Sequence, residues 1–178
     1  MASVNKANLG EVDAELFRIN NMEKKYTNLI KVPVVINAVT GVVLSTNKEF
    51  PIDGWNSLRP YYIGIRHGVF FTKKGTEGMN RLEVTDLDQI FKMLESGRLD
   101  IAVITELTAK RELIKFGDSD IKILYPPVQV VNLYHYLHKD NIHLLEPLTK
   151  ELLKMEQSGE IKRIREKYIE TLDSTVNP

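Results

Sequence analysis

Charged and polar residues follow two short apolar runs of the sequence. The residues directly after these runs are Arg66, His67 and Gly68, and Thr105 and Glu106. An arginine fork binds a carboxylate through two parallel hydrogen bonds, and a glutamate is a partner for a cation. If both runs are parallel strands of one sheet, their carboxyl ends meet where such sheets bind ligands. The residues after these runs are therefore candidates for ligand recognition.

Other residue types that carry chemistry are absent or poorly spaced. The chain has no cysteine, which removes disulfides, thiolate nucleophiles and cysteine-based zinc sites. His135 and His138 stand three apart in an extended stretch, so they point to opposite faces and make a poor metal pair. No HExxH, P-loop, GxGxxG or GxSxG motif occurs. We therefore expect no enzyme, no metal and no cofactor.

Composition narrows the class of protein further. The 178 residues are 43% hydrophobic and 27% charged, an ordinary mixture for a globular domain. The 24 basic and 24 acidic residues cancel, so no global field attracts nucleic acid or an anionic membrane. No apolar run approaches the length of a membrane-spanning helix. We expect neither a nucleic-acid partner nor direct membrane insertion.

The elements that must position the candidate residues alternate between strand and helix. Strands are predicted at residues 61–65, 81–85, 99–105 and 122–124, and helices at 69–74, 86–97 and 106–115. Asp86 is a helix N-cap, and Gly97 and Gly117 are helix ends. This order is typical of an α/β sheet covered on both faces, with mainly parallel strands.

The remaining patterns flank this alternating region. Residues 29–45 read as two extended segments joined near Thr40 and Gly41. Pro126 and Pro127 are expected to separate the strand at 122–124 from a second one at 128–137. Two helices are expected within residues 144–172, hinged at Ser158 and Gly159.

Several segments together resemble the type-3 bacterial extracellular solute-binding proteins, the receptors of polar amino-acid ABC transporters. Residues 97–106, GRLDIAVITE, resemble the family's "GRxDavi.D" segment, and residues 57–68 resemble the strand that opens the second lobe. Residues 152–161 with Lys167 and Tyr168 are similar to the closing helices. Residues 12–18 and 28–33 are similar to the last part of the first lobe.

The resemblance implies a fold and a division of the chain. We expect a periplasmic-binding-protein-like lobe, a three-layer αβα arrangement with a mainly parallel sheet and hinge-crossing strands, plus a remnant of the first lobe. Residues 1–56 would hold the remnant and the hinge-crossing strands, and residues 57–178 the second lobe and closing C-terminal helices. Segments that open the first lobe in family members have no counterpart, so an N-terminally truncated form is expected.

The resemblance also implies roles for the candidate residues. The backbone N–H groups at Gly68 and Val69 would hold a ligand carboxylate, although Gly68 can equally be a turn glycine. Arg66 and His67 would help to bind this carboxylate, or they would form a solvated surface pair. Glu106, after Thr105, would hold the ligand's α-amino group, or serve as a first-turn acid of its helix. Arg18 would correspond to a cleft arginine.

The implied function is non-catalytic. The chain would bind a small polar solute such as an amino acid and serve as the receptor component of an ABC-type transport system with a permease partner. Its place would be periplasmic or extracellular by family, or cytoplasmic if Met1 is the true start. The alternatives are a degenerate or sensory single-lobe domain that acts through homodimerisation, or a transferase or regulator effector domain of the same fold.

Overall fold

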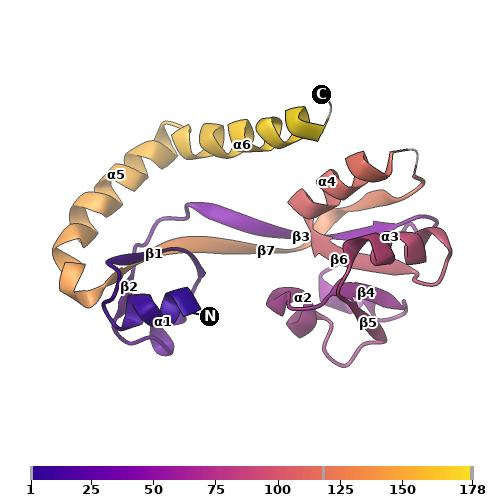
Figure 1. Cartoon of the computed structure of the whole chain (residues 1–178), viewed down its shortest axis with the longest axis horizontal. Coiled ribbons are helices and arrows are strands. Elements are labelled where there is room, and N and C mark those ends of the chain that lie inside the picture. The colour runs from indigo at the N-terminus through magenta and orange to yellow at the C-terminus, as the bar shows by residue number, and fades with distance from the viewer. Residues whose placement is uncertain (1, 118, 177–178) are drawn as a thin grey trace. The chain divides into compact units, whose positions relative to one another are not determined.

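The chain forms two compact units (Figure 1), and the computed structural model describes residues 2–117 and 119–176. The first unit consists of Met1–Val39 and Val131–Thr171. The second unit is Thr40–Val130, to which the end of the last helix, from Leu172, is also assigned. Strands β3 (Asn37–Ser45) and β7 (Lys122–His138) each run from one unit into the other.

The second unit is an α/β sheet in which the parallel strands lie together. Its strand order is β3-β6-β4-β5, and its elements are η2 (Trp55–Leu58), β4 (Ile63–Arg66), α2 (Phe70–Gly75), β5 (Arg81–Val84), α3 (Leu87–Glu95), β6 (Ile101–Thr105) and α4 (Glu106–Phe116). β4 pairs in parallel with both neighbours, Ile63 lying opposite Arg81 and Ile101. β3 pairs antiparallel with β6. The fold class predicted from the sequence is confirmed.

Alternate residues of this sheet enter two separate cores. Ala102 and Ile104 of β6 pack with Phe91 and Leu94 of α3, while Val103 packs on the opposite face. Successive strand residues point to opposite faces, so β6 is apolar throughout because both of its faces are covered. Helices α3 and α4 cover the first face. The second face is covered by the irregular segment with η2, whose Leu58 is fully buried.

Local sequence signals fix the ends of α3 and α4, the two longer helices of the second unit. The Asp86 side chain accepts a hydrogen bond from the Asp88 amide at 3.0 Å, which caps α3 as predicted. Thr105 caps α4 in the same way, and Gly117 ends that helix with φ of 61°. That backbone conformation is disfavoured for any residue with a Cβ atom. These caps place the start of α4 directly at the carboxyl end of β6.

The first unit is built around the last part of β7. It contains α1 (Ala2–Asn8), β1 (Ala14–Ile19), η1 (Met22–Lys24), β2 (Leu29–Lys31), η3 (Lys139–Leu144), α5 (Leu145–Gln157) and most of α6 (Glu160–Val176). β1 and β2 both pair antiparallel with β7. Tyr136 is fully buried in a core with Val4 and Ala7 of α1, and the next residue, Leu137, packs on the side of α5. Within the described part of the chain, no helix has the length and apolar character needed to cross a membrane.

The boundaries of the units differ from the predicted ranges 1–56 and 57–178. The difference arises from α5, which packs in the first unit because its Leu152 joins the core formed with Val32 and Val34. Apart from the end of the last helix, only the middle of the chain therefore forms the second unit. The order of elements along the sequence does not show that α5 packs with residues of the N-terminal segment.

Two predicted breaks in strands are wrong. Thr40 and Gly41 do not join two strands but lie inside β3, and the break comes earlier, between β2 and β3. Pro126 and Pro127 lie inside β7, which continues unbroken for 17 residues. Proline's fixed φ is compatible with extended backbone, so these two prolines remove hydrogen-bond donors without ending the strand.

Candidate functional site

The turn after β4 carries two hydrogen-bond donors that find no acceptor among the described residues. Arg66 ends β4, and its exposed guanidinium makes no hydrogen bond or ion pair with any described residue. Gly68 has φ of 82°, a conformation that favours glycine, and its amide also lacks a partner among the described residues. The turn therefore presents N–H groups to a ligand.

The turn after β6 carries two linked hydroxyl groups. Thr105 Oγ1 donates a hydrogen bond to Thr108 Oγ1 at 2.7 Å and accepts one from the Thr108 amide at 3.4 Å. Each threonine hydroxyl has one proton to donate, so the Thr108 proton remains unused within the pair. An acceptor on a ligand can take it.

The two turns meet because β4 and β6 are parallel neighbours, with Ile65 opposite Val103. A small cavity of about 90 Å³ lies between them. It is lined by Arg66, Val69, Thr72, Leu87, Val103, Ile104, Thr105 and Thr108. Complete pockets for small molecules usually measure roughly 300–1,000 Å³, so this cavity fits one end group of a solute.

The lining of this cavity includes three of the predicted residues and two hydroxyl groups that sequence reasoning missed. Arg66, Val69 and Thr105 are the predicted members. The missed hydroxyls are those of Thr72, which donates to the Val69 carbonyl at 3.0 Å, and Thr108. Spacing was an available signal for Thr108, because a threonine three residues after an N-cap threonine lies above it in the first turn.

Glu106 is held by two neighbours and is not part of the cavity lining. Tyr125 donates a hydrogen bond to Glu106 Oε1 at 2.7 Å, and Lys110 Nζ lies 3.0 Å from the same oxygen. Burial raises the pKa of the Glu106 carboxyl, but these two hydrogen bonds and the charge of Lys110 outweigh burial, so the pKa lies below its ordinary value. Burial, the hydrogen bond to Glu106 and its charge raise the pKa of Tyr125 to about 12. Glu106 is therefore ionised and paired at neutral pH.

His67 points into a charged cluster on the neighbouring strand. Its Nδ1 lies 3.2 Å from Glu83 Oε2, and Glu83 also pairs with Lys73 and Arg81. The hydrogen bond from Lys73 lowers the pKa of Glu83, burial opposes that effect, and His67 and the charges of Lys73 and Arg81 lower the pKa further. His67 is adjacent to Arg66 in the chain but is not among the residues that line the cavity.

Arg18 belongs to the first unit and already has partners there. Its guanidinium pairs with Glu15 and donates to Ser3 Oγ at 2.7 Å and to the Phe17 carbonyl at 2.8 Å. The structure therefore brings Arg66, Val69 and Thr105 together and leaves Arg18 in a separate, satisfied network of the other unit.

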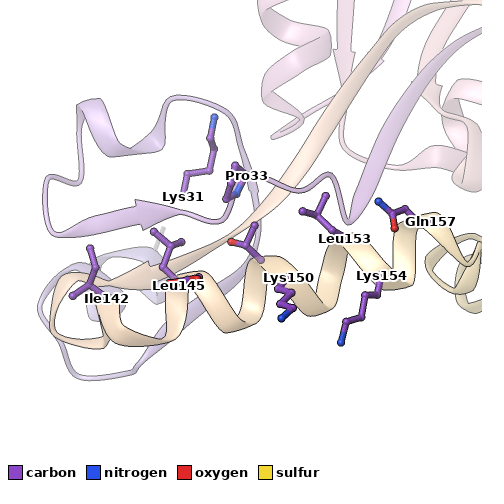
Figure 2. Close-up of a pocket in the computed structure, with 10 residues that line it drawn as sticks. Lys31, Pro33, Ile142, Leu145, Lys150, Leu153, Lys154 and Gln157 are labelled. Carbon is purple, nitrogen blue, oxygen red and sulfur yellow. The ribbon is translucent and has the colours of Figure 1, made fainter.

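A larger, more open hollow of about 680 Å³ lies along α5 in the first unit. Figure 2 shows Leu145 and Leu153 projecting from α5 toward the segment with Lys31 and Pro33. Its walls are mainly apolar, and Lys154, which contributes to its lining, pairs with Glu151. Its lining also includes the buried Thr149 hydroxyl, which has no hydrogen-bond partner among the described residues. The cavity of the second unit lies at the carboxyl ends of parallel strands, where such sheets bind ligands, so we take it as the candidate solute site.

The arrangement in the second unit suits recognition of an anion. Arg66, the Gly68 amide and the Thr108 hydroxyl are all donors. Within residues 2–117 and 119–176, no group of three or more histidine, cysteine or acidic side chains is arranged to hold a metal ion. The cavity lining holds one guanidinium, three hydroxyls and apolar walls.

The sequence matches a known protein family over more than half of its length. Residues 72–171 match the bacterial extracellular solute-binding proteins, family 3. An uncharacterized protein of Shewanella oneidensis is 25% identical over 165 residues, which cover 88% of this chain and 62% of that protein. The chain thus spans less than two thirds of that relative's length.

Solved structures share the fold at low sequence identity. The GluR0 ligand-binding core in complex with L-glutamate has a TM-score of 0.69 at 10% identity, covering 94% of this chain and 77% of that one. The substrate-binding protein AbpA of an amino-acid ABC transporter from Streptococcus pneumoniae, bound to L-arginine, has a TM-score of 0.61 at 15% identity, covering 95% and 73%. A histidine kinase sensor domain with similarity to periplasmic binding proteins has a TM-score of 0.60 at 15% identity, covering 92% and 72%.

Proposed function

Because the chain belongs to the bacterial extracellular solute-binding proteins of family 3, we propose that it binds a small polar solute such as an amino acid without transforming it. In this proposal it serves as the receptor component of an ABC-type transport system, delivers the solute to a permease, and acts in the periplasm or outside the cell. Two structural neighbours carry L-glutamate and L-arginine, which supports a solute with a carboxylate.

The observation that carries the proposal is the unpartnered guanidinium of Arg66 beside a cavity of end-group size. Arginine binds carboxylates through two parallel hydrogen bonds, and such charge-assisted bonds are about twice as strong as neutral ones. The Gly68 amide adds a donor in the same turn. We propose that Arg66, Gly68, Val69 and Thr105 contact the solute, and that His67 and Glu106 set the charge of the surroundings.

Titration calorimetry of the folded chain against amino acids and small organic acids tests this proposal. We expect binding heat for at least one carboxylate-bearing solute and none for a neutral sugar of similar size. Circular dichroism on the same sample verifies that the protein is folded. Absence of heat for every carboxylate, with folded protein, contradicts the proposed function.

A second candidate is a sensory role through self-association. The similarity to a histidine kinase sensor domain favours it. So does β1, a strand at the end of the sheet order on which Leu16, Phe17 and Ile19 are exposed. Exposed apolar edge strands pair readily with a second copy. Light scattering that shows a monomer of 20.4 kDa, with and without solute, contradicts this candidate.

A further inference from the structure

The cavity of the second unit contains no acidic residue. Its polar lining consists of one cation, Arg66, and the hydroxyls of Thr72, Thr105 and Thr108. An α-amino acid carries an ammonium group next to its carboxylate. A buried ammonium group without an anionic partner is costly, and a like charge at Arg66 increases the cost.

Of the acids at this edge, Glu106 and Glu83 are paired with basic side chains, and Asp86, which precedes the lining residue Leu87, accepts the Asp88 amide as the cap of α3. Glu106 follows Thr105 directly, but Lys110 and Tyr125 hold its carboxylate. Glu83, on the neighbouring β5, is surrounded by three basic side chains. Neither residue is part of the cavity lining. The positive charge of a bound ammonium group would therefore meet no free carboxylate in this lining.

The same cavity provides donors and apolar walls. The Arg66 guanidinium and the unused Thr108 proton can bind carboxylate oxygens. The apolar part of the lining consists of Val69, Leu87, Val103 and Ile104. Methylene groups next to the carboxylate would contact this wall, where an ammonium group would lose its hydration.

We propose that the solute is a short aliphatic carboxylic acid or dicarboxylic acid without an α-ammonium group, bound through its carboxylate by Arg66 and Thr108. This inference rests on the proposed function and replaces its example solute, an amino acid, with a carboxylic acid that lacks the ammonium group. Thr108 becomes a specificity-determining residue, because its hydroxyl belongs to the same cavity lining as Arg66.

Matched pairs of solutes test the inference by calorimetry. Glutarate is compared with glutamate, succinate with aspartate, and propionate with alanine. We expect the acid without the ammonium group to bind at least tenfold more tightly in each pair that binds. Equal or tighter binding of the amino acids contradicts this inference alone. Absence of binding by every compound contradicts the proposed function and this inference together.

A variant that adds a negative charge to the cavity lining tests the same inference in the protein itself. Thr105→Asp introduces a carboxylate into the lining and keeps a good helix N-cap, so α4 is preserved. Thr105→Asn is the matched control, since it also caps the helix but carries no charge. We expect Thr105→Asp to shift the preference toward the amino acids by at least tenfold relative to Thr105→Asn. An unchanged preference in both folded variants contradicts the inference.

Discussion

The hydroxyl of Thr105 donates a hydrogen bond to the hydroxyl of Thr108 across 2.7 Å, and both residues line the cavity of the second unit. The same Thr105 oxygen caps α4 by accepting from the Thr108 amide. One pair of side chains thus fixes the start of a helix and supplies the hydroxyl donor of the proposed site. Stability and recognition are therefore expected to respond differently to changes at these two positions.

Loss of the cap at Thr105 is expected to destabilise the protein. Thr105→Ala removes the oxygen that accepts the Thr108 amide, and we expect a loss of about 1 kcal/mol in the free energy of unfolding. Thr105→Ser retains a capping oxygen and should lose clearly less. Urea denaturation followed by circular dichroism measures both. Equal stability of the alanine variant and the unaltered protein would show that the cap contributes nothing.

The hydrogen bond between Tyr125 and Glu106 is expected to appear in acid titrations. Tyr125→Phe removes one of the interactions that lower the pKa of Glu106, so this pKa should rise toward its ordinary value. A carboxyl with a lowered pKa in the folded state stabilises the protein above its unfolded pKa, and this contribution disappears as pH falls through the folded pKa. Acid unfolding of the variant should therefore begin at a higher pH.

Carbon NMR of the Glu106 carboxyl measures this pKa directly. Tyr61→Phe serves as the control, because Tyr61 stacks on Phe50 in the same unit and makes no hydrogen bond to Glu106. The control should leave the pKa of Glu106 unchanged. An identical pKa in Tyr125→Phe and the unaltered protein would refute the role given to the tyrosine hydroxyl.

Two adjacent leucines of α5 test the packing of that helix in the first unit. Leu152 is 8% exposed and packs with Val32, Val34 and Leu137, whereas Leu153 is 39% exposed. Leu152→Ala should lower the free energy of unfolding by about 2–4 kcal/mol because it leaves a cavity. Leu153→Ala should cost less than about 1 kcal/mol. Chemical denaturation compares the two, and similar losses would contradict the packing described for α5.

Much of the second unit could be predicted because its signals are local. The N-cap Asp86, the helix-ending Gly117 and the apolar strand before Thr105 each mark an element within a few residues. The positions of Arg66 and Thr105 at strand ends followed from the same alternation. Their meeting at one cavity required only that β4 and β6 be parallel neighbours.

The features that the sequence did not predict depend on contacts between distant parts of the chain. Nothing local shows that Leu152 of α5 packs on Val32, which sets the extent of the first unit. The pairing of Glu106 with Tyr125 joins residues 19 apart, on a strand that the sequence predicted to break at Pro126. The spacing of Thr108 from the N-cap Thr105 was a usable signal for its position, but the proton left unused in their hydrogen bond is a property of geometry rather than of residue type.

Calorimetry of Arg66→Ala with the tightest-binding carboxylate tests the central claim most directly. Removing the guanidinium should cost about 2 kcal/mol or more of binding free energy, roughly a thirtyfold loss of affinity. Arg59→Ala, at another exposed arginine of the same unit, should bind as the unaltered protein does. If folded Arg66→Ala binds the carboxylate as tightly as the unaltered protein, the second-unit cavity is not where the solute is recognised.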